Sequence, residues 1–213
     1  MSSALTLQSL PLFPLSTVLF PGGILPLKIF EVRYLDMISK VHKAGAPLGV
    51  VSLTEGGEVQ VPGQKEAFRD VGTLATLEQV EQPQPGLMHI RARGGQRFRI
   101  LRRERLRHGL WVADVQMLAP DTHVDVPGDL QGVATALDRL LGSLRDQGVA
   151  EEDLPVRAPF ALDDCGWLAN RWCELMPMPA ELKQRLMELD NPLVRLELVG
   201  DLLANAGIDT RAA

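Results

Sequence analysis

The sequence predicts an α+β protein with a β-rich N-terminal domain over residues 1–120 and an all-helical C-terminal domain over residues 121–213. Apolar residues alternate or form short runs between turn signals in the first domain, and recur at helical spacing in the second. The charge balance changes at the same point. Residues 1–120 carry 14 Lys and Arg against 10 Asp and Glu, whereas residues 121–213 carry 8 against 17. Two compositionally different domains are therefore expected.

The first strands are expected in a short apolar segment that proline interrupts repeatedly. Apolar runs cover Leu10–Leu15 and Thr17–Phe20, the turn signal Pro21-Gly22-Gly23 follows, and a third run covers Ile24–Ile29. Because proline lacks an N–H for a β-ladder, such strands belong at edges, bulges or strand starts. These strands suit a small irregular barrel.

A helix is predicted immediately after these runs, because the apolar spacing changes at Phe30. Its apolar stripe consists of Phe30, Tyr34, Met37, Ile38 and Val41. His42 and Lys43 occupy the expected last turn, and Gly45 and Pro47 end the helix. We expect the helix to pack on the barrel.

Further strands are predicted over Leu48–Leu53, Val71–Val80 and Leu110–Leu118, with a loop at Gln82–Gly86. The alternating segments on either side of Gly94-Gly95 predict a hairpin that turns at this glycine pair. In that hairpin Met88, Ile90, Ala92, Phe98 and Ile100 face inward, and the arginines between them face outward.

Four helices are predicted in the C-terminal half. The first starts near Pro127 and carries a leucine-rich stripe, including Leu140, as far as Gly148. Asp163 or Asp164 caps a second helix that Pro177 ends, and Pro179 starts a short third one. The last helix is capped by Asn191, starts at Pro192 and ends at Gly207; its inward residues are Leu196, Val199 and Leu203.

Several motifs carry a family resemblance that extends over nearly the whole chain. They are Leu10-Pro-Leu-Phe-Pro14, Val18-Leu-Phe-Pro-Gly22, Leu25-Pro-Leu-Lys-Ile-Phe-Glu-Val-Arg-Tyr34, Val71-Gly-Thr73, Gly94–Ile100, Ala169-Asn-Arg-Trp-Cys-Glu-Leu-Met-Pro177, Lys183–Leu186 and Asn191–Leu196. Together they resemble the N-terminal domain of the Lon ATP-dependent proteases. The resemblance implies a PUA-like β-barrel followed by a helical bundle. In that family the domain is associated with substrate recognition and with assembly of the hexamer.

The residues offer no motif for catalysis. No Gly-x-x-x-x-Gly-Lys-Ser/Thr phosphate-binding loop occurs, so the glycine pairs are interpreted as turns. Ser39 and Lys43 could act as a nucleophile and its base, but they are interpreted as part of a solvated helix face. The four histidines are scattered and no Cys-x-x-Cys pair is present, so no metal or other cofactor is expected. No motif supports an active site for a small-molecule substrate. We therefore expect a non-enzymatic protein.

The two cysteines and the apolar pattern indicate a cytoplasmic protein. Cys165 and Cys173 lie eight residues apart on a predicted helix, about 12 Å at 1.5 Å rise per residue, which is too far for a disulfide. They are therefore expected to be buried thiols. No run of about 18 apolar residues predicts a membrane span, and the N-terminus lacks the basic region of a secretory signal.

The leading functional hypothesis is recognition of unfolded or exposed polypeptide, or an adaptor role beside a protease partner. Methionine and aromatic side chains suit adaptable apolar binding. The candidate binding residues are Phe20, Pro21, Trp167, Trp172, Met176 and Met178. Core packing explains the tryptophans and methionines equally well. A weak homo-oligomer is an open alternative.

RNA binding is the second hypothesis, and it depends on the eight arginines between residues 91 and 107. A basic stripe is the electrostatic requirement for binding nucleic acid, and PUA-like folds recur in RNA-binding proteins. The candidate residues are Arg91, Arg93, Arg97 and Arg99. Outward arginines also discourage edge pairing between sheets, and this interpretation is preferred, so no nucleic-acid partner is expected.

Overall fold

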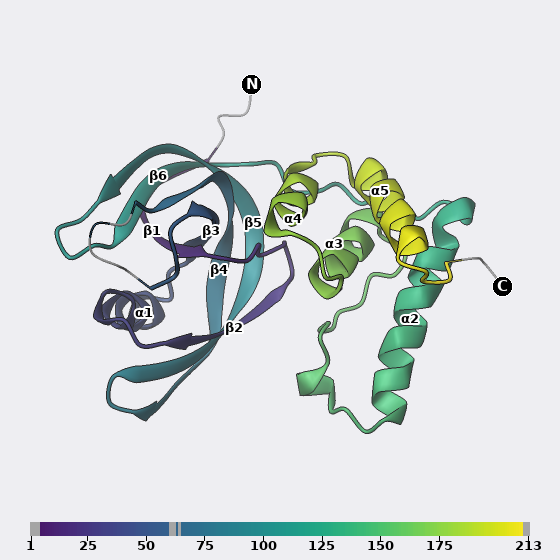
Figure 1. Cartoon of the computed structure of the whole chain (residues 1–213), viewed down its shortest axis with the longest axis horizontal. Coiled ribbons are helices and arrows are strands. Elements are labelled where there is room, and N and C mark those ends of the chain that lie inside the picture. The colour runs from purple at the N-terminus through teal and green to yellow at the C-terminus, as the bar shows by residue number, and fades with distance from the viewer. Residues whose placement is uncertain (1–4, 60–62, 64, 211–213) are drawn as a thin grey trace. The chain divides into compact units, whose positions relative to one another are not determined.

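The computed structural model describes residues 5–59, 63 and 65–210, and it has a mixed α+β architecture (Figure 1). The contacts within the chain separate it into two compact units, Met1–Pro120 and Asp121–Ala213. In the parts of the chain that the structure describes there are six strands and five α-helices. No helix within these ranges combines the length and hydropathy needed to span a bilayer.

One mixed sheet forms the first unit. Its strands are β1 (Thr6–Leu15), β2 (Ile24–Ile29), β3 (Leu48–Glu55), β4 (Ala67–Gln84), β5 (Leu87–Arg105) and β6 (Trp111–Met117), in the order β2-β5-β4-β3-β1-β6. The second half of β5 also pairs with β6, so the pairings of β1, β3, β4, β5 and β6 form a closed circuit. β2 lies outside this circuit, antiparallel to the first half of β5 (Figure 1).

The predicted hairpin at Gly94-Gly95 is wrong, because β5 runs continuously through both glycines. The turn between β4 and β5 lies instead at Pro85-Gly86, where Gly86 has a φ of 80°. β4 therefore continues to Gln84, into the segment predicted as a loop at Gln82–Gly86. Gly94 serves a close backbone approach. Its N–H donates to the Gly23 carbonyl over 2.8 Å, and a Cβ at Gly94 would lie 2.1 Å from the Phe20 carbonyl oxygen.

The outward position predicted for Arg97 is also wrong, because its side chain is only 3% exposed. Thr73 pairs with Arg97 and Ala75 with Gly94, which leaves one extra residue in β5 between the two pairs. A bulge of this kind interrupts the alternation of faces along a strand. The prediction assumed an uninterrupted alternation and therefore failed at this position.

Helix α1 (Val32–Ala44) packs its predicted stripe into the core of the first unit, with one exception. Tyr34, Met37, Ile38 and Val41 are buried in a cluster with residues of β1, β2, β3 and β5. Phe30 lies before the helix and is 57% exposed. Gly45 adopts the left-handed conformation at the helix end, as the sequence predicts.

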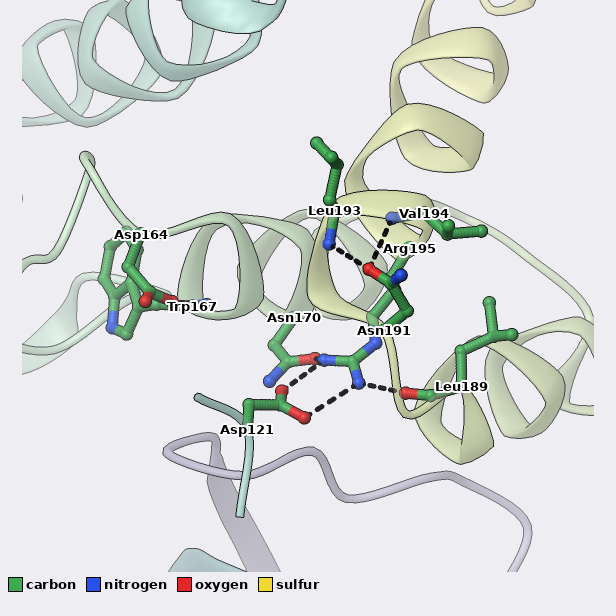
Figure 2. Close-up of polar contacts among 9 residues, drawn as sticks. All are labelled: Asp121, Asp164, Trp167, Asn170, Leu189, Asn191, Leu193, Val194 and Arg195. Carbon is green, nitrogen blue, oxygen red and sulfur yellow. Dashed lines mark hydrogen bonds and ion pairs between the residues drawn. The ribbon is translucent and has the colours of Figure 1, made fainter. Parts of the chain in front are cut away.

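The second unit is built from α2 (Gln131–Asp146), α3 (Cys165–Leu175), α4 (Ala180–Glu188) and α5 (Pro192–Asn205), with short 3₁₀ turns at Gly128–Leu130 and Glu151–Asp153. The predicted caps are confirmed for α3 and α5. Asp164 Oδ1 accepts from the Trp167 N–H over 2.6 Å, and Asn191 Oδ1 accepts from the N–H groups of Leu193 and Val194 (Figure 2).

Three details of the helical prediction are corrected. Asp125 forms an isolated β-bridge with Asp164, so α2 starts at Gln131, after a 3₁₀ turn, and not near Pro127. Leu140 is exposed and does not join the buried stripe of α2. The cap of α5 is Ala206, and Gly207 follows it with a φ of 75°. The helices themselves follow their predicted order.

Candidate functional site

An apolar pocket opens on the first unit where β1, the junction of β2 with α1, and the segment after β3 meet. Its lining residues are Phe13, Leu15, Leu27, Lys28, Ile29, Phe30, Glu31, Tyr34, Glu58 and Val59. The pocket is small, with a cavity volume of about 60 Å³. It therefore suits at most one apolar side chain, and not an extended cofactor.

Two aromatic residues within the lining are buried. The Phe13 and Tyr34 rings lie with their centroids 4.2 Å apart, and the Arg33 guanidinium lies 4.4 Å from the Tyr34 centroid. The Tyr34 hydroxyl has no hydrogen-bond partner among the described residues, and burial raises its pKa. A buried hydroxyl without a partner is destabilising.

The rim of the pocket exposes apolar side chains. Phe30 is 57% exposed and Val59 is 50% exposed, and both line the pocket; Val32, the first residue of α1, is 72% exposed. Clustered exposed apolar residues beside a pocket mark a surface for interaction. Sequence reasoning missed this site because it placed Phe30 in the buried stripe of the helix.

A buried charge cluster holds the start of α1, and with it one wall of the pocket. Arg33 is buried; its Nη1 donates to the Gly109 carbonyl over 2.9 Å, and its Nε lies 3.2 Å from Glu31. Glu66 lies 3.8 Å from Arg33 and accepts from the Trp111 indole N–H over 2.8 Å. Contacts with the turn between β5 and β6 and with the residue before β4 thus hold Arg33, and with it the neighbouring Glu31 and Tyr34.

The predicted polypeptide-binding residues do not gather in this pocket. Phe20 is fully buried at 0% exposure, and Trp172 and Met176 are also buried, so these side chains pack inside their units. The Trp172 indole N–H donates to the Val133 carbonyl over 3.1 Å. The remaining three, Pro21, Trp167 and Met178, are half-buried. None of the six lines the pocket described above.

The predicted RNA-binding arginines do not form a continuous basic surface. Arg93 forms an ion pair with Glu78, Arg97 is buried, and Arg99 is exposed. Arg91 lines a second groove of about 810 Å³, part of it open solvent. That groove has mixed charge, since Lys28, His89 and Glu81 line it as well. The carboxylates beside these arginines oppose binding of a polyanion.

In the second unit, the recognisable sequence motifs form a buried polar network (Figure 2). Arg195 is 1% exposed; its guanidinium donates to Asp121 over 2.5 and 3.1 Å, to Asn170 Oδ1 over 3.0 Å and to the Leu189 carbonyl. Asp121, α3, the end of α4 and α5 are thereby joined. A buried, multiply bonded arginine of this kind stabilises packing and is not available to a ligand.

Three further titratable groups lie in α3: the half-buried Glu174 and the buried Cys165 and Cys173. Arg171 Nη2 donates to Glu174 over 2.7 Å, yet burial raises the pKa of Glu174 to about 7. Burial also raises the pKa of the Cys173 thiol to about 12 and that of Cys165 above its usual range. Both cysteines are free, as the sequence predicts, and neither has the character of a reactive thiolate.

Comparison with known proteins agrees with the fold and the motifs. The family model described as the ATP-dependent protease La (LON) substrate-binding domain matches residues 9–205. The Lon protease of Paraburkholderia phytofirmans is 31% identical over 211 residues, which cover 95% of this chain and 25% of that protein. Lon protease 1 of Syntrophobacter fumaroxidans is 25% identical over 193 residues, which cover 89% of this chain and 23% of that protein. The chain thus spans about a quarter of the length of these curated relatives.

Two solved structures of Lon N-terminal domains are also similar to this chain. A Lon N-terminal domain protein from Xanthomonas campestris is 30% identical, with a TM-score of 0.70 over 93% of this chain and 98% of that chain. The N-terminal domain of a Mycobacterium avium complex Lon protease shares the fold, with a TM-score of 0.58 at 17% identity over 93% of this chain and 99% of that chain. This chain belongs to the family of Lon substrate-binding domains.

Proposed function

We propose that this chain recognises exposed polypeptide segments without catalysis, and that the pocket between β1, β2 and α1 is the recognition site. Family membership supports a role in substrate recognition. The observation that carries the site is the exposed apolar rim, with Phe30 and Val59 beside a pocket that Phe13 and Tyr34 line. Such a surface suits the apolar side chains that an unfolded chain exposes.

In this proposal the two units have different roles. The circuit of strand pairings in the first unit supports a PUA-like barrel that carries the recognition surface, over residues 1–120. The helical unit, over residues 121–213, serves as a scaffold, since its network around Arg195 is internal. A protease of the Lon family is the proposed partner that unfolds and cleaves the bound polypeptide. Two free buried thiols suit the cytoplasm.

The test measures binding to a permanently unfolded protein, such as reduced and carboxymethylated α-lactalbumin, by fluorescence anisotropy. Phe30→Ser should weaken binding about tenfold, because an exposed aromatic residue at a pocket rim is a typical hot spot. Leu101→Ser is the matched control, since Leu101 is 58% exposed on β5 of the same unit and does not line the pocket. Equal binding by both variants would place the recognition site elsewhere.

A further inference from the structure

We infer that the pocket binds its polypeptide as an added β-strand along the outer edge of β2, with one large apolar side chain inserted between the strand and α1. This inference rests on the proposed function and specifies its binding mode. It follows from three features of the described residues: how β2 lines the pocket, which backbone groups of β2 have no partner, and which charges stand at the rim.

The pocket lies along an edge of β2 rather than on one of its faces. Side chains alternate between the two faces of a strand, so a pocket on one face would be lined by every second residue. Here the last three residues of β2, Leu27, Lys28 and Ile29, all line the pocket, as do Phe30 and Glu31 directly after the strand. Consecutive residues share a pocket when the pocket follows the edge of the strand and its continuation toward α1.

This edge of β2 is open. β2 is the first strand in the sheet order and pairs with β5 alone. Within the described part of the chain, no backbone hydrogen bond reaches β2 from any other segment. An open edge presents unpaired N–H and C=O groups, which is the requirement for binding an extended chain by β-augmentation.

The register identifies the open groups. The Gly94 N–H donates to the Gly23 carbonyl, and Ile24 is paired with Arg93, so Gly23 and then Leu25, Leu27 and Ile29 direct their backbone groups toward β5. Ile24, Pro26 and Lys28 therefore direct theirs outward. Pro26 lacks a backbone N–H, and an outward position that makes no ladder hydrogen bond tolerates proline. The outward donors are the Ile24 and Lys28 N–H groups, and Lys28 is the one that borders the pocket.

The rim charges indicate the chemistry of the ligand. Glu31, Glu58 and Lys28 line the pocket, and Arg33 compensates the charge of Glu31. The Glu58 carboxylate and the Lys28 ammonium group therefore give the rim both signs of charge. Strand geometry would place an apolar side chain in the pocket and its sequence neighbours at the rim. The geometry therefore selects an extended segment in which a large apolar residue is flanked by polar or charged residues.

The experiment uses a fluorescent nine-residue peptide with a central Phe flanked by Lys residues, and two N-methylated versions of it. One version is methylated at the odd backbone amides and the other at the even amides. A strand paired on one edge uses only one of these two sets, so one version should bind at least tenfold more weakly than the other. Equal binding of the two versions would overturn the strand mode.

Substitutions on the protein give an independent readout. Lys28→Pro removes the outward N–H beside the pocket and should weaken peptide binding roughly three- to tenfold relative to Lys28→Ala, which removes only the side chain. Pro26→Val adds an outward N–H and should strengthen binding roughly threefold. Thermal unfolding verifies that each variant is folded. If Lys28→Pro does not fold, the two N-methylated peptides alone test the strand mode of binding.

The outcomes separate the binding mode from the proposed function. If Phe30→Ser abolishes binding while Lys28→Pro matches Lys28→Ala, the pocket binds a side chain without strand pairing, and only the further inference fails. If Phe30→Ser has no effect on either ligand, the proposed function fails at this site. If the edge instead forms a dimer with a second copy of the chain, light scattering will show it and peptide binding will fall as the protein concentration rises.

Discussion

The most distinctive residues of the two units lie in different places: those of the second unit are internal, and those of the first unit border a pocket. In the second unit the charged side chain of Arg195 is buried and bonded to Asp121, Asn170 and the Leu189 carbonyl. In the first unit Phe30 and Val59 are exposed around a pocket, and the Tyr34 hydroxyl is buried without a described partner. The network around Arg195 is internal, which is typical of scaffold, and the exposed apolar rim of the pocket is typical of a binding site. Buried polar atoms without a partner among the described residues occur in both units, the Arg195 Nε and the Tyr34 hydroxyl included. The most recognisable motifs of the C-terminal half therefore maintain the fold.

The largest effect should come from breaking the network in the second unit. Arg195→Ala leaves Asp121 and Asn170 without their shared partner in the interior, and should lower the free energy of unfolding by about 3–5 kcal/mol. Chemical denaturation measures this change. Arg185→Ala is the control, because Arg185 forms an exposed pair with Glu181 worth no more than about 1 kcal/mol. Similar losses in both variants would contradict a structural role for the network.

A smaller loss is expected from a glycine in the first unit. Gly94→Ala places a Cβ 2.1 Å from the Phe20 carbonyl oxygen, so the backbone must shift, at a cost of about 2–3 kcal/mol. Gly95→Ala is an adjacent control, since the nearest atom to its Cβ lies 3.6 Å away. Denaturant midpoints of the two variants should differ clearly. If they coincide, Gly94 is not needed for close approach of Phe20.

The buried carboxyl group of Glu174 should make the stability of the second unit depend on pH. Burial raises its pKa from 4.5 to about 7, so the folded state binds a proton more tightly than the unfolded state. The resulting stability is present below about pH 4.5 and is lost as the pH rises through about 7, on the order of 3 kcal/mol. Glu174→Gln should flatten this part of the profile of melting temperature against pH. An unchanged profile would assign the dependence to other groups.

The smallest effect concerns the orphan hydroxyl of the pocket. Tyr34→Phe removes a buried group that has no described partner, so the free protein should become more stable by about 1 kcal/mol. Thermal unfolding of the unliganded protein measures this. A loss of stability would show that the hydroxyl already has a partner in solution, and the pocket would then lose part of its contrast with the second unit.

Prediction from sequence succeeded where the signal is local. The caps at Asp164 and Asn191 need only side-chain oxygens within a few residues of the helix start, and Gly45 ends α1 for a similarly local reason. It failed where the partner is distant in sequence. Gly94 resembles a turn residue until the strand meets the Phe20 backbone, and the exposure of Phe30 depends on where α1 begins.

The sequence by itself determined the α+β class, most of the strands and helices, and membership of the Lon substrate-binding domain family. Periodicity and motifs are properties of consecutive residues, so they can be seen without coordinates. Only the tertiary structure decided that Arg97 and Phe20 are buried, that β2 has an open outer edge, and that Phe13, Tyr34 and Val59 share a pocket. The physical reason is that strand pairing and burial depend on segments tens of residues apart, and alternation along one strand does not reveal its neighbours.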